Sequence, residues 1–101
     1  MACEIIWSTR AKQTIENNLT YLKDNWTQKE VNAFVLKSEY YINFISENPI
    51  TFAVSRKRKN IRSVLIVKQI RLYYKFYPRK NIIVLLSFFN TKQKPSKLKL
   101  K

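Results

Sequence analysis

The chain has 101 residues, of which 46% are apolar, and a formal net charge of +14. This length suits a single domain, residues 1–101, built around one hydrophobic core. Because the sequence contains no glycine and no histidine, it excludes glycine-rich phosphate loops, catalytic nucleophile–histidine pairs and histidine metal sites. We therefore expect a binding protein without a cofactor or metal, in which any catalysis would have to use Arg, Lys and Tyr side chains.

Cations and acids are distributed very unevenly along the chain. Residues 1–47 hold five Lys and Arg and all six acids, a net charge of −1, whereas residues 48–101 hold the other fifteen cations and no acid, a net charge of +15. The second half therefore predicts an anionic partner: nucleic acid, an acidic protein or a membrane surface. A single cysteine, no recognisable signal peptide and no apolar run long enough to span a bilayer favour a cytoplasmic protein.

The first elements expected are a short strand and a helix. Residues 4–7 (EIIW) have the composition of a strand, and Ser8 follows as a helix N-cap, since its hydroxyl can accept a hydrogen bond from a free N–H of the first turn. Apolar residues then recur at helical spacing, which predicts a helix from about residue 9 to residue 23. These apolar residues are Ala11, Ile15, Leu19 and Leu22.

A second helix is predicted from Gln28 to about Glu47. Thr27 and Glu30 form a capping box at its start, and Asn48-Pro49 ends it, because the residue before a proline is driven out of the helical region. The short break between the helices predicts an antiparallel hairpin with Trp26 packed at its corner. The stripe expected to be buried on this helix comprises Val31, Phe34, Val35, Ser38, Tyr41, Ile42 and Ile45, widened by Tyr40 and Phe44.

Three strands are expected in the second half of the chain. Residues 61–67 form the first strand, Lys68-Gln69 a tight turn, and residues 70–77 and 82–89 a β-hairpin. The last run is apolar on both faces apart from Ser87, which predicts an interior strand covered on both sides. In the absence of glycine, positive φ at the turns is expected at asparagine, namely Asn60, Asn81 and Asn90.

The order of these elements is strand, helix, helix and three strands. It indicates an α+β fold, β-α-α-β-β-β, with the helical hairpin packed on one face of a small, mainly antiparallel sheet. In the strand 70–77, Leu72 and Tyr74 then face the helices. The side chains between them alternate cations with rings and form an open platform: Arg71, Tyr73, Lys75 and Tyr77.

Two further basic segments flank this platform. The run Arg56, Lys57, Arg58 and Lys59 precedes the three strands, and residues 91–101 form a basic tail expected to fray or to dock on binding. A solvated loop is the alternative for the run of four cations. Together with the platform, these segments supply phosphate-holding cations and stacking rings, so a plain nucleic-acid-binding module is one interpretation of the sequence.

The chain contains, in this order, IIWSTRA, LTYLKDNW, ISENP, IRSVLIVKQIRLYYKF and NIIVLLSFFNTKQKP. In this order and spacing, these segments resemble the RelE/ParE superfamily of bacterial type II toxins. IIWSTRA with the helix after it is similar to the family's opening, and LTYLKDNW with a helix closing on ISENP is similar to the ParE-type helical hairpin. IRSVLIVKQIRLYYKF and NIIVLLSFFNTKQKP are similar to the family's strands and its common ending. The resemblance covers nearly the whole chain. It implies a cytoplasmic toxin that forms a hetero-oligomer with a cognate acidic antitoxin from the same operon.

The resemblance leaves two targets open. RelE-type toxins cleave mRNA on the ribosome, and by position Arg62, Arg71 and Lys92 match their catalytic or phosphate-holding cations. Val64 stands where those nucleases have a lysine, and Lys92 replaces the usual arginine with its planar fork. These departures and the long helices favour the ParE branch, whose members inhibit DNA gyrase. The resemblance thus implies a gyrase inhibitor of a plasmid-stabilisation module, with an mRNA endonuclease as the alternative.

Overall fold

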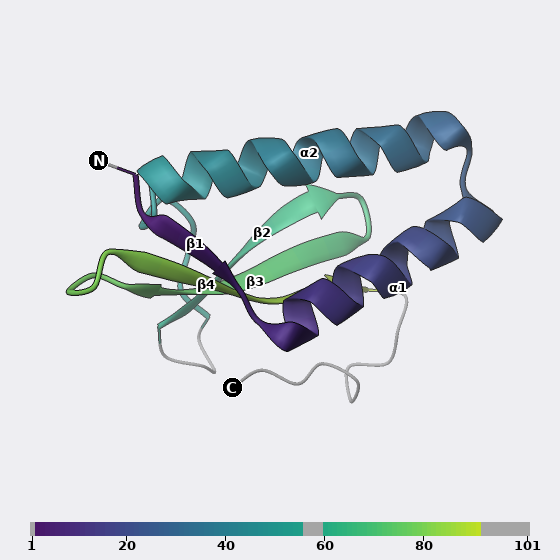
Figure 1. Ribbon diagram of the computed structural model, residues 1–101. Helices are drawn as coiled ribbons and strands as arrows, with labels where there is room; N and C mark the ends of the chain where they lie inside the picture. The colour runs from purple at the N-terminus through teal and green to yellow at the C-terminus, as the bar shows by residue number, and fades with distance from the viewer. Residues whose placement is uncertain (1, 56–59, 92–101) are drawn as a thin grey trace.

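The chain runs through strand and helix in the predicted order (Figure 1). The computed structural model describes residues 2–55 and 60–91. Within them the elements are β1 (Glu4–Trp7), α1 (Thr9–Asn25), α2 (Gln28–Glu47), β2 (Ile61–Val67), β3 (Ile70–Tyr77) and β4 (Ile82–Asn90). The expected α+β fold is confirmed. No helix in these two ranges is both long enough and apolar enough to cross a membrane.

The strands of the described residues form one sheet in the order β1-β4-β3-β2. β2 pairs with β3, and β3 with β4, in antiparallel fashion, while β1 lies parallel to β4 with Trp7 opposite Leu85. The parallel pair follows from the connection, since the chain leaves β1 through a helical hairpin and not through a tight turn. β4, the most apolar strand, therefore lies in the interior of the sheet, as predicted.

Both helices begin where the sequence predicts, because side chains cap their first N–H groups. Ser8 Oγ accepts a hydrogen bond from the Ala11 N–H at 3.0 Å. In α2, Thr27 Oγ1 accepts from the Glu30 N–H at 3.2 Å, and Glu30 Oε1 accepts from the Thr27 N–H at 3.0 Å, which completes the predicted capping box. α1 continues two residues beyond its expected end and stops at Trp26, whose backbone is extended.

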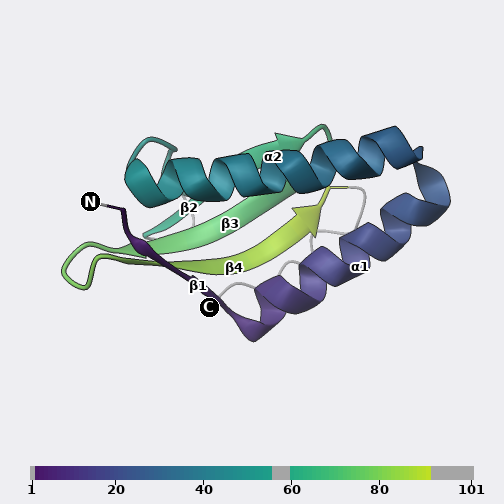
Figure 2. The same cartoon turned by 45° about the horizontal axis from the view of Figure 1, so that its top comes forward.

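The two helices cover the same face of the sheet (Figure 2). Beneath them, Phe34 of α2 packs edge-on against Phe88 of β4, with ring centroids 6.4 Å apart, and Trp7 stacks on Phe88 at 5.6 Å. Leu72 and Tyr74 of β3 point into this core and are fully buried. The predicted alternation of side chains along β3 is therefore confirmed.

α1 also completes the edge of β4 beyond the point where β1 ends. Thr14 Oγ1 accepts from the Phe88 N–H at 3.0 Å, and Asn18 Nδ2 donates to the Phe88 carbonyl oxygen at 2.8 Å. Ser8 Oγ donates to the Leu86 carbonyl oxygen at 3.2 Å. Side chains of the helix thus satisfy backbone groups that have no partner strand, which explains why Asn18 is buried although it is polar.

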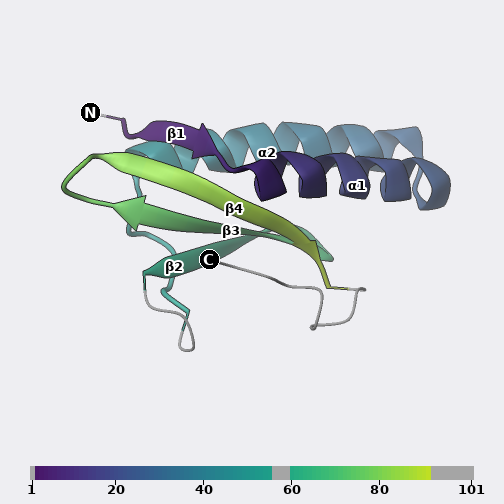
Figure 3. The same ribbon diagram turned by 60° about the horizontal axis from the view of Figure 1, so that its bottom comes forward.

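Two expectations about the strands and turns were wrong. Asn60 and Asn81 have positive φ as predicted, at 67° and 56°, but Asn90 does not, because it continues β4 as its last residue. β4 was expected to be covered on both sides, yet both helices lie on one side of the sheet (Figure 3). On its other side, Ser87 opposite Tyr73 is buried, but Val84 and Phe89 are only half-buried among the described residues.

α2 is also more exposed than expected. Val35 and Tyr40 were assigned to the buried stripe, but 37% of Val35 and 62% of Tyr40 are exposed. Leu36, between them, is 66% exposed. The buried side of α2 is therefore narrower than the run of apolar residues in its sequence, and part of that run forms an apolar outer side.

Candidate functional site

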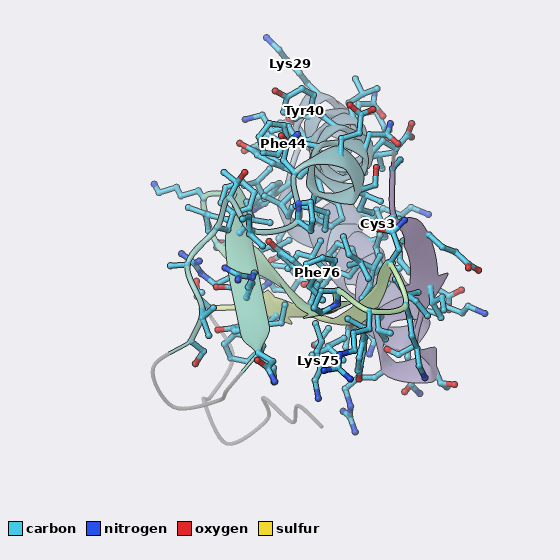
Figure 4. All side chains as sticks on the ribbon, turned by 90° about the vertical axis from the view of Figure 1, so that its left-hand side faces the viewer. Cys3, Lys29, Tyr40, Phe44, Lys75 and Phe76 are labelled. Atoms are coloured by element: carbon cyan, nitrogen blue, oxygen red, sulfur yellow. The ribbon has the colours of Figure 1, made fainter. Side chains whose placement is uncertain are left out.

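The face of the sheet turned away from the helices carries the predicted platform. Arg71, Tyr73 and Lys75 are half-buried there, and Tyr77 is exposed. Figure 4 shows Lys75 and Phe76 leaving β3 on opposite sides of the sheet. We call this side of the sheet, with Arg71, Tyr73, Lys75 and Tyr77, the open face. Because β3 is an interior strand, the open face runs along the middle of the sheet.

Arg71 is held in place at one end of the open face. Its Nη1 donates to Ser63 Oγ on β2 at 3.0 Å. Its cross-strand neighbours are Leu65 of β2 and Phe89 of β4, so the side chain leaves the backbone between two apolar residues. A guanidinium has five N–H donors, and the bond to Ser63 leaves others for a ligand. Arg71 thus presents an oriented cation to a phosphate or a carboxylate.

The other end of the open face lies at the β3–β4 hairpin. Lys75 Nζ lies 5.2 Å from the centroid of the Tyr77 ring, within the range of a cation–π contact. Next to this pair is a pocket of about 330 Å³ lined by Tyr77, Pro78, Arg79 and Lys80. Arg79 and Lys80 were not among the predicted site residues. Their position in the predicted hairpin turn could have identified them, because two cations there extend the charged surface of the strands.

Arg62 lies on the other side of the sheet. It pairs in register with Tyr74, and its Nη1 donates to the carbonyl oxygens of Phe52 at 2.6 Å and of Ile50 at 3.5 Å. These carbonyls belong to the segment after α2, so the guanidinium ties that segment to the covered side of the sheet. Arg62 also lines a pocket of about 230 Å³ there. The structure therefore does not bring Arg62 and Arg71 together at one site.

Tyr74 is a buried tyrosine next to Arg62. Burial raises the pKa of Tyr74 from 10.0 to about 12, and the charge of Arg62 opposes this effect in part. The Tyr74 hydroxyl has no hydrogen-bond partner in the described part of the chain. A group sealed in this way cannot reach a ligand on the open face, so Tyr74 is a core residue.

The remaining candidate positions divide into two groups. Val64, where RelE-type nucleases carry a lysine, is 5% exposed and belongs to the core. Five predicted site residues lie outside the described residues: Arg56, Lys57, Arg58, Lys59 and Lys92.

The chemistry available on the open face is that of cations and aromatic rings. All six acids of the chain precede Asn48, so no carboxylate comes from β3 or its hairpin. Within residues 2–55 and 60–91, no group of three His, Cys, Asp or Glu side chains is placed to hold a metal ion. The open face can therefore hold anionic groups, stack on planar groups and stabilise negative charge that develops on a bound molecule.

Chains of known structure share this fold. One is a chain of the toxin–antitoxin complex RelBE2 from Mycobacterium tuberculosis, at 15% identity and a TM-score of 0.61, with 89% of this chain and 99% of that chain covered. Another is a metal-bound toxin from Helicobacter pylori, at 14% identity and a TM-score of 0.58, with 89% and 96% covered. No family model matches the sequence, and no curated protein is similar to it in sequence. The chain therefore has the fold of these two proteins, as the resemblance implies.

Proposed function

We propose that this chain is the toxin of a type II toxin–antitoxin pair, that it acts in the cytoplasm, and that its open face engages an anionic target. The observation that supports this most strongly is the pairing of a fold shared with toxins and a row of cations and rings on the side of the sheet that α1 and α2 do not cover. A charged surface that serves only solubility normally mixes both signs, whereas residues 48–101 carry a net charge of +15 without one acid.

An acidic antitoxin is the partner that fits such a surface. Arg71 and Lys75 of β3 carry charges of the same sign, and an acidic peptide laid along the open face would relieve their repulsion. Such a peptide would also deny the target access to Arg71 and Tyr73. One of the chains with this fold comes from a toxin–antitoxin complex, which supports a partner of this kind.

DNA gyrase is the target we favour. Cleavage of RNA needs several groups converging on one phosphate, but Arg62 and Arg71 leave the sheet on opposite sides. Val64 places an apolar side chain in the core where a nuclease would have a third cation. A toxin that acts by binding needs no such convergence, and the ParE branch of the resemblance acts in this way.

An mRNA endonuclease is the alternative, and the geometry of Arg71 is the observation that favours it. Arg71 is oriented by Ser63 on the face that α1 and α2 do not cover, with Tyr73 as its neighbour on the same side. In that case Arg71 would stabilise the charge that develops on the phosphate, while Lys92 or a tyrosine moves the proton.

Induced expression with separate readouts of DNA and protein synthesis tests the proposal. We expect DNA synthesis to stop first, and the purified chain to inhibit supercoiling by gyrase. If protein synthesis stops first and translated mRNA is cut, the endonuclease is correct, and Arg71→Ala should then abolish cleavage while Lys12→Ala, on α1, should not. Growth that continues without either arrest would reject the toxin proposal. Neutralisation by a short acidic protein encoded next to this chain would support it.

A further inference from the structure

The outer side of α2 carries a row of four residues that the proposed function does not use. At 100° per residue, Lys29, Leu36, Tyr40 and Glu47 fall within a sector of about 40°. Leu36 and Tyr40 are the apolar residues most exposed on this helix, and Lys29 and Glu47 are exposed at its two ends. Figure 4 shows Lys29 and Tyr40 on the side of α2 turned away from the sheet. We call these four residues the outer row.

Tyr40 packs against two neighbouring rings although it is exposed. Its ring stacks on Phe44 with centroids 6.3 Å apart and meets Tyr41 edge-on at 5.2 Å. Phe44 and Tyr41 in turn contact the ring of Phe52 in the segment after α2. An aromatic ring whose rotamers are already restricted by neighbouring rings loses less entropy on binding, as is common for the central residues of protein interfaces.

The two charges of the outer row interact unfavourably with the dipole of α2. Lys29 lies in the first turn of α2 and Glu47 at its last residue, where the helix favours an acid and a base respectively. Each charge therefore costs α2 stability in an isolated chain. A neighbouring helix that runs in the opposite direction would bring complementary dipole ends and complementary charges to both positions.

The outer row of one copy is complementary to the outer row of a second copy whose α2 runs in the opposite direction. Lys29 and Glu47 are equally far from position 38, since 38 − 29 equals 47 − 38, and Leu36 and Tyr40 share the same midpoint. A two-fold axis at this level places Lys29 of one copy beside Glu47 of the other at both ends. In the middle it places Leu36 of each copy against Tyr40 of the other. A single axis therefore pairs all four residues.

We propose that two copies of this chain associate through an antiparallel contact between their α2 helices, centred between Leu36 and Tyr40. The contact joins the halves of low charge, residues 1–47 with a net charge of −1, and leaves the two basic halves apart. A polyanion is a poor occupant of this surface, because the row carries one charge of each sign. The open face lies on the other side of the sheet and stays free, so this proposal does not depend on the toxin proposal.

Measurement of the mass of the full chain in solution over a range of concentrations tests the contact. One chain is 12.2 kDa, and we expect the mass to rise toward twice that value with concentration. Tyr40→Asp should keep the chain monomeric, because it places two buried carboxylates at the centre of the contact. Tyr21→Asp is the matched control, since Tyr21 is an exposed tyrosine of α1, and it should leave the dimer intact. A chain that is monomeric at every concentration would overturn the proposal.

A charge exchange identifies the antiparallel pairing itself. Lys29→Glu or Glu47→Lys alone replaces two attractive pairs by two repulsive ones and should weaken the dimer roughly tenfold at low salt. The double variant Lys29→Glu/Glu47→Lys should restore the dimer. Both changes suit the dipole of α2, so loss of the helix cannot explain a weaker dimer. A dimer that persists in Tyr40→Asp, or that the double variant does not restore, uses another surface and would reject this contact.

Discussion

Leu72 and Tyr74 point from β3 toward the helices, and Arg71, Tyr73 and Lys75 point from the same strand away from them. The first two are completely covered and contribute through burial. The other three keep part of their surface in solvent, and Arg71 and Lys75 are oriented by one hydrogen bond and one cation–π contact. One strand thus carries a side that stabilises the fold and a side that is available for binding. Substitutions should therefore separate these properties as well.

The largest loss of stability is expected at the centre of the covered side. Phe34 is fully buried and packs edge-on against Phe88, so Phe34→Ala removes a large apolar contact and leaves a cavity. We expect the free energy of unfolding to fall by about 3–5 kcal/mol. Urea denaturation measures this loss. Val35→Ala, at the next and partly exposed position of α2, should change it by less than about 1 kcal/mol. Equal losses at both positions would contradict the assignment of the core.

A smaller loss is expected where α1 serves the edge of β4. Asn18→Ala leaves the Phe88 carbonyl oxygen without its donor, which should cost about 1–3 kcal/mol. Asn17 is exposed on the same helix, and Asn17→Ala should be neutral or slightly stabilising because alanine is the better helix former. The difference in urea midpoint between the two variants isolates the buried bond. No difference would show that water replaces the Asn18 amide.

Those parts of the fold that depend on neighbouring residues could be predicted from the sequence. Ser8 and the Thr27–Glu30 box identify the helix starts because capping is a contact between residues three positions apart. The alternation of β3 follows from the geometry of a strand and places Arg71 and Tyr73 on one side. The whole open face of β3 could thus be identified before any contact was known.

The position of Arg62 was predicted less well, although the sequence held a signal for it. Arg62 shares its side of β2 with Val64 and Ile66, both buried, so its parity already places it on the covered side. The resemblance to RelE-type toxins grouped it with Arg71 instead. Its actual role depends on the carbonyl of Phe52, and a contact with an irregular segment cannot be read from periodicity.

The exposure of Tyr40 could not be predicted for a different reason. An apolar residue on an amphipathic helix is assigned to the core by default, and Tyr40 is bordered by Tyr41 and Phe44. Only the position of α2 over the sheet shows how wide its buried side is. The excess of apolar residues on α2 is then a property of its surface, not of its core.

Tyr74 offers a finer test of the covered side, through pH. Its pKa is about 12 in the folded chain against 10.0 as the ordinary value, so the folded state disfavours the ionised phenol. The contribution of Tyr74 to the free energy of unfolding is therefore fully present below pH 10, and it is lost as the pH rises toward 12. Tyr74→Phe should therefore be nearly neutral at pH 7, since the hydroxyl has no partner, and should reduce the loss of stability at alkaline pH. Tyr73→Phe, on the open face, should not reduce the loss of stability at alkaline pH. Unfolding followed from pH 7 upward distinguishes the two variants.

The smallest change in stability is expected at Arg71. Substitution there should instead change the binding of a ligand to the open face. Arg71→Ala removes one hydrogen bond to Ser63 at the surface, so the free energy of unfolding should change by less than about 0.5 kcal/mol. If the open face holds the phosphates of a nucleic acid, binding should weaken with salt, and the variant should reduce the slope of log affinity against log salt by about 1. Lys12→Ala removes the same charge from α1 and should leave the slope unchanged. A flat salt response of the unsubstituted chain would exclude charge-driven binding of nucleic acid to the open face and, with it, the role of Arg71 as a phosphate ligand.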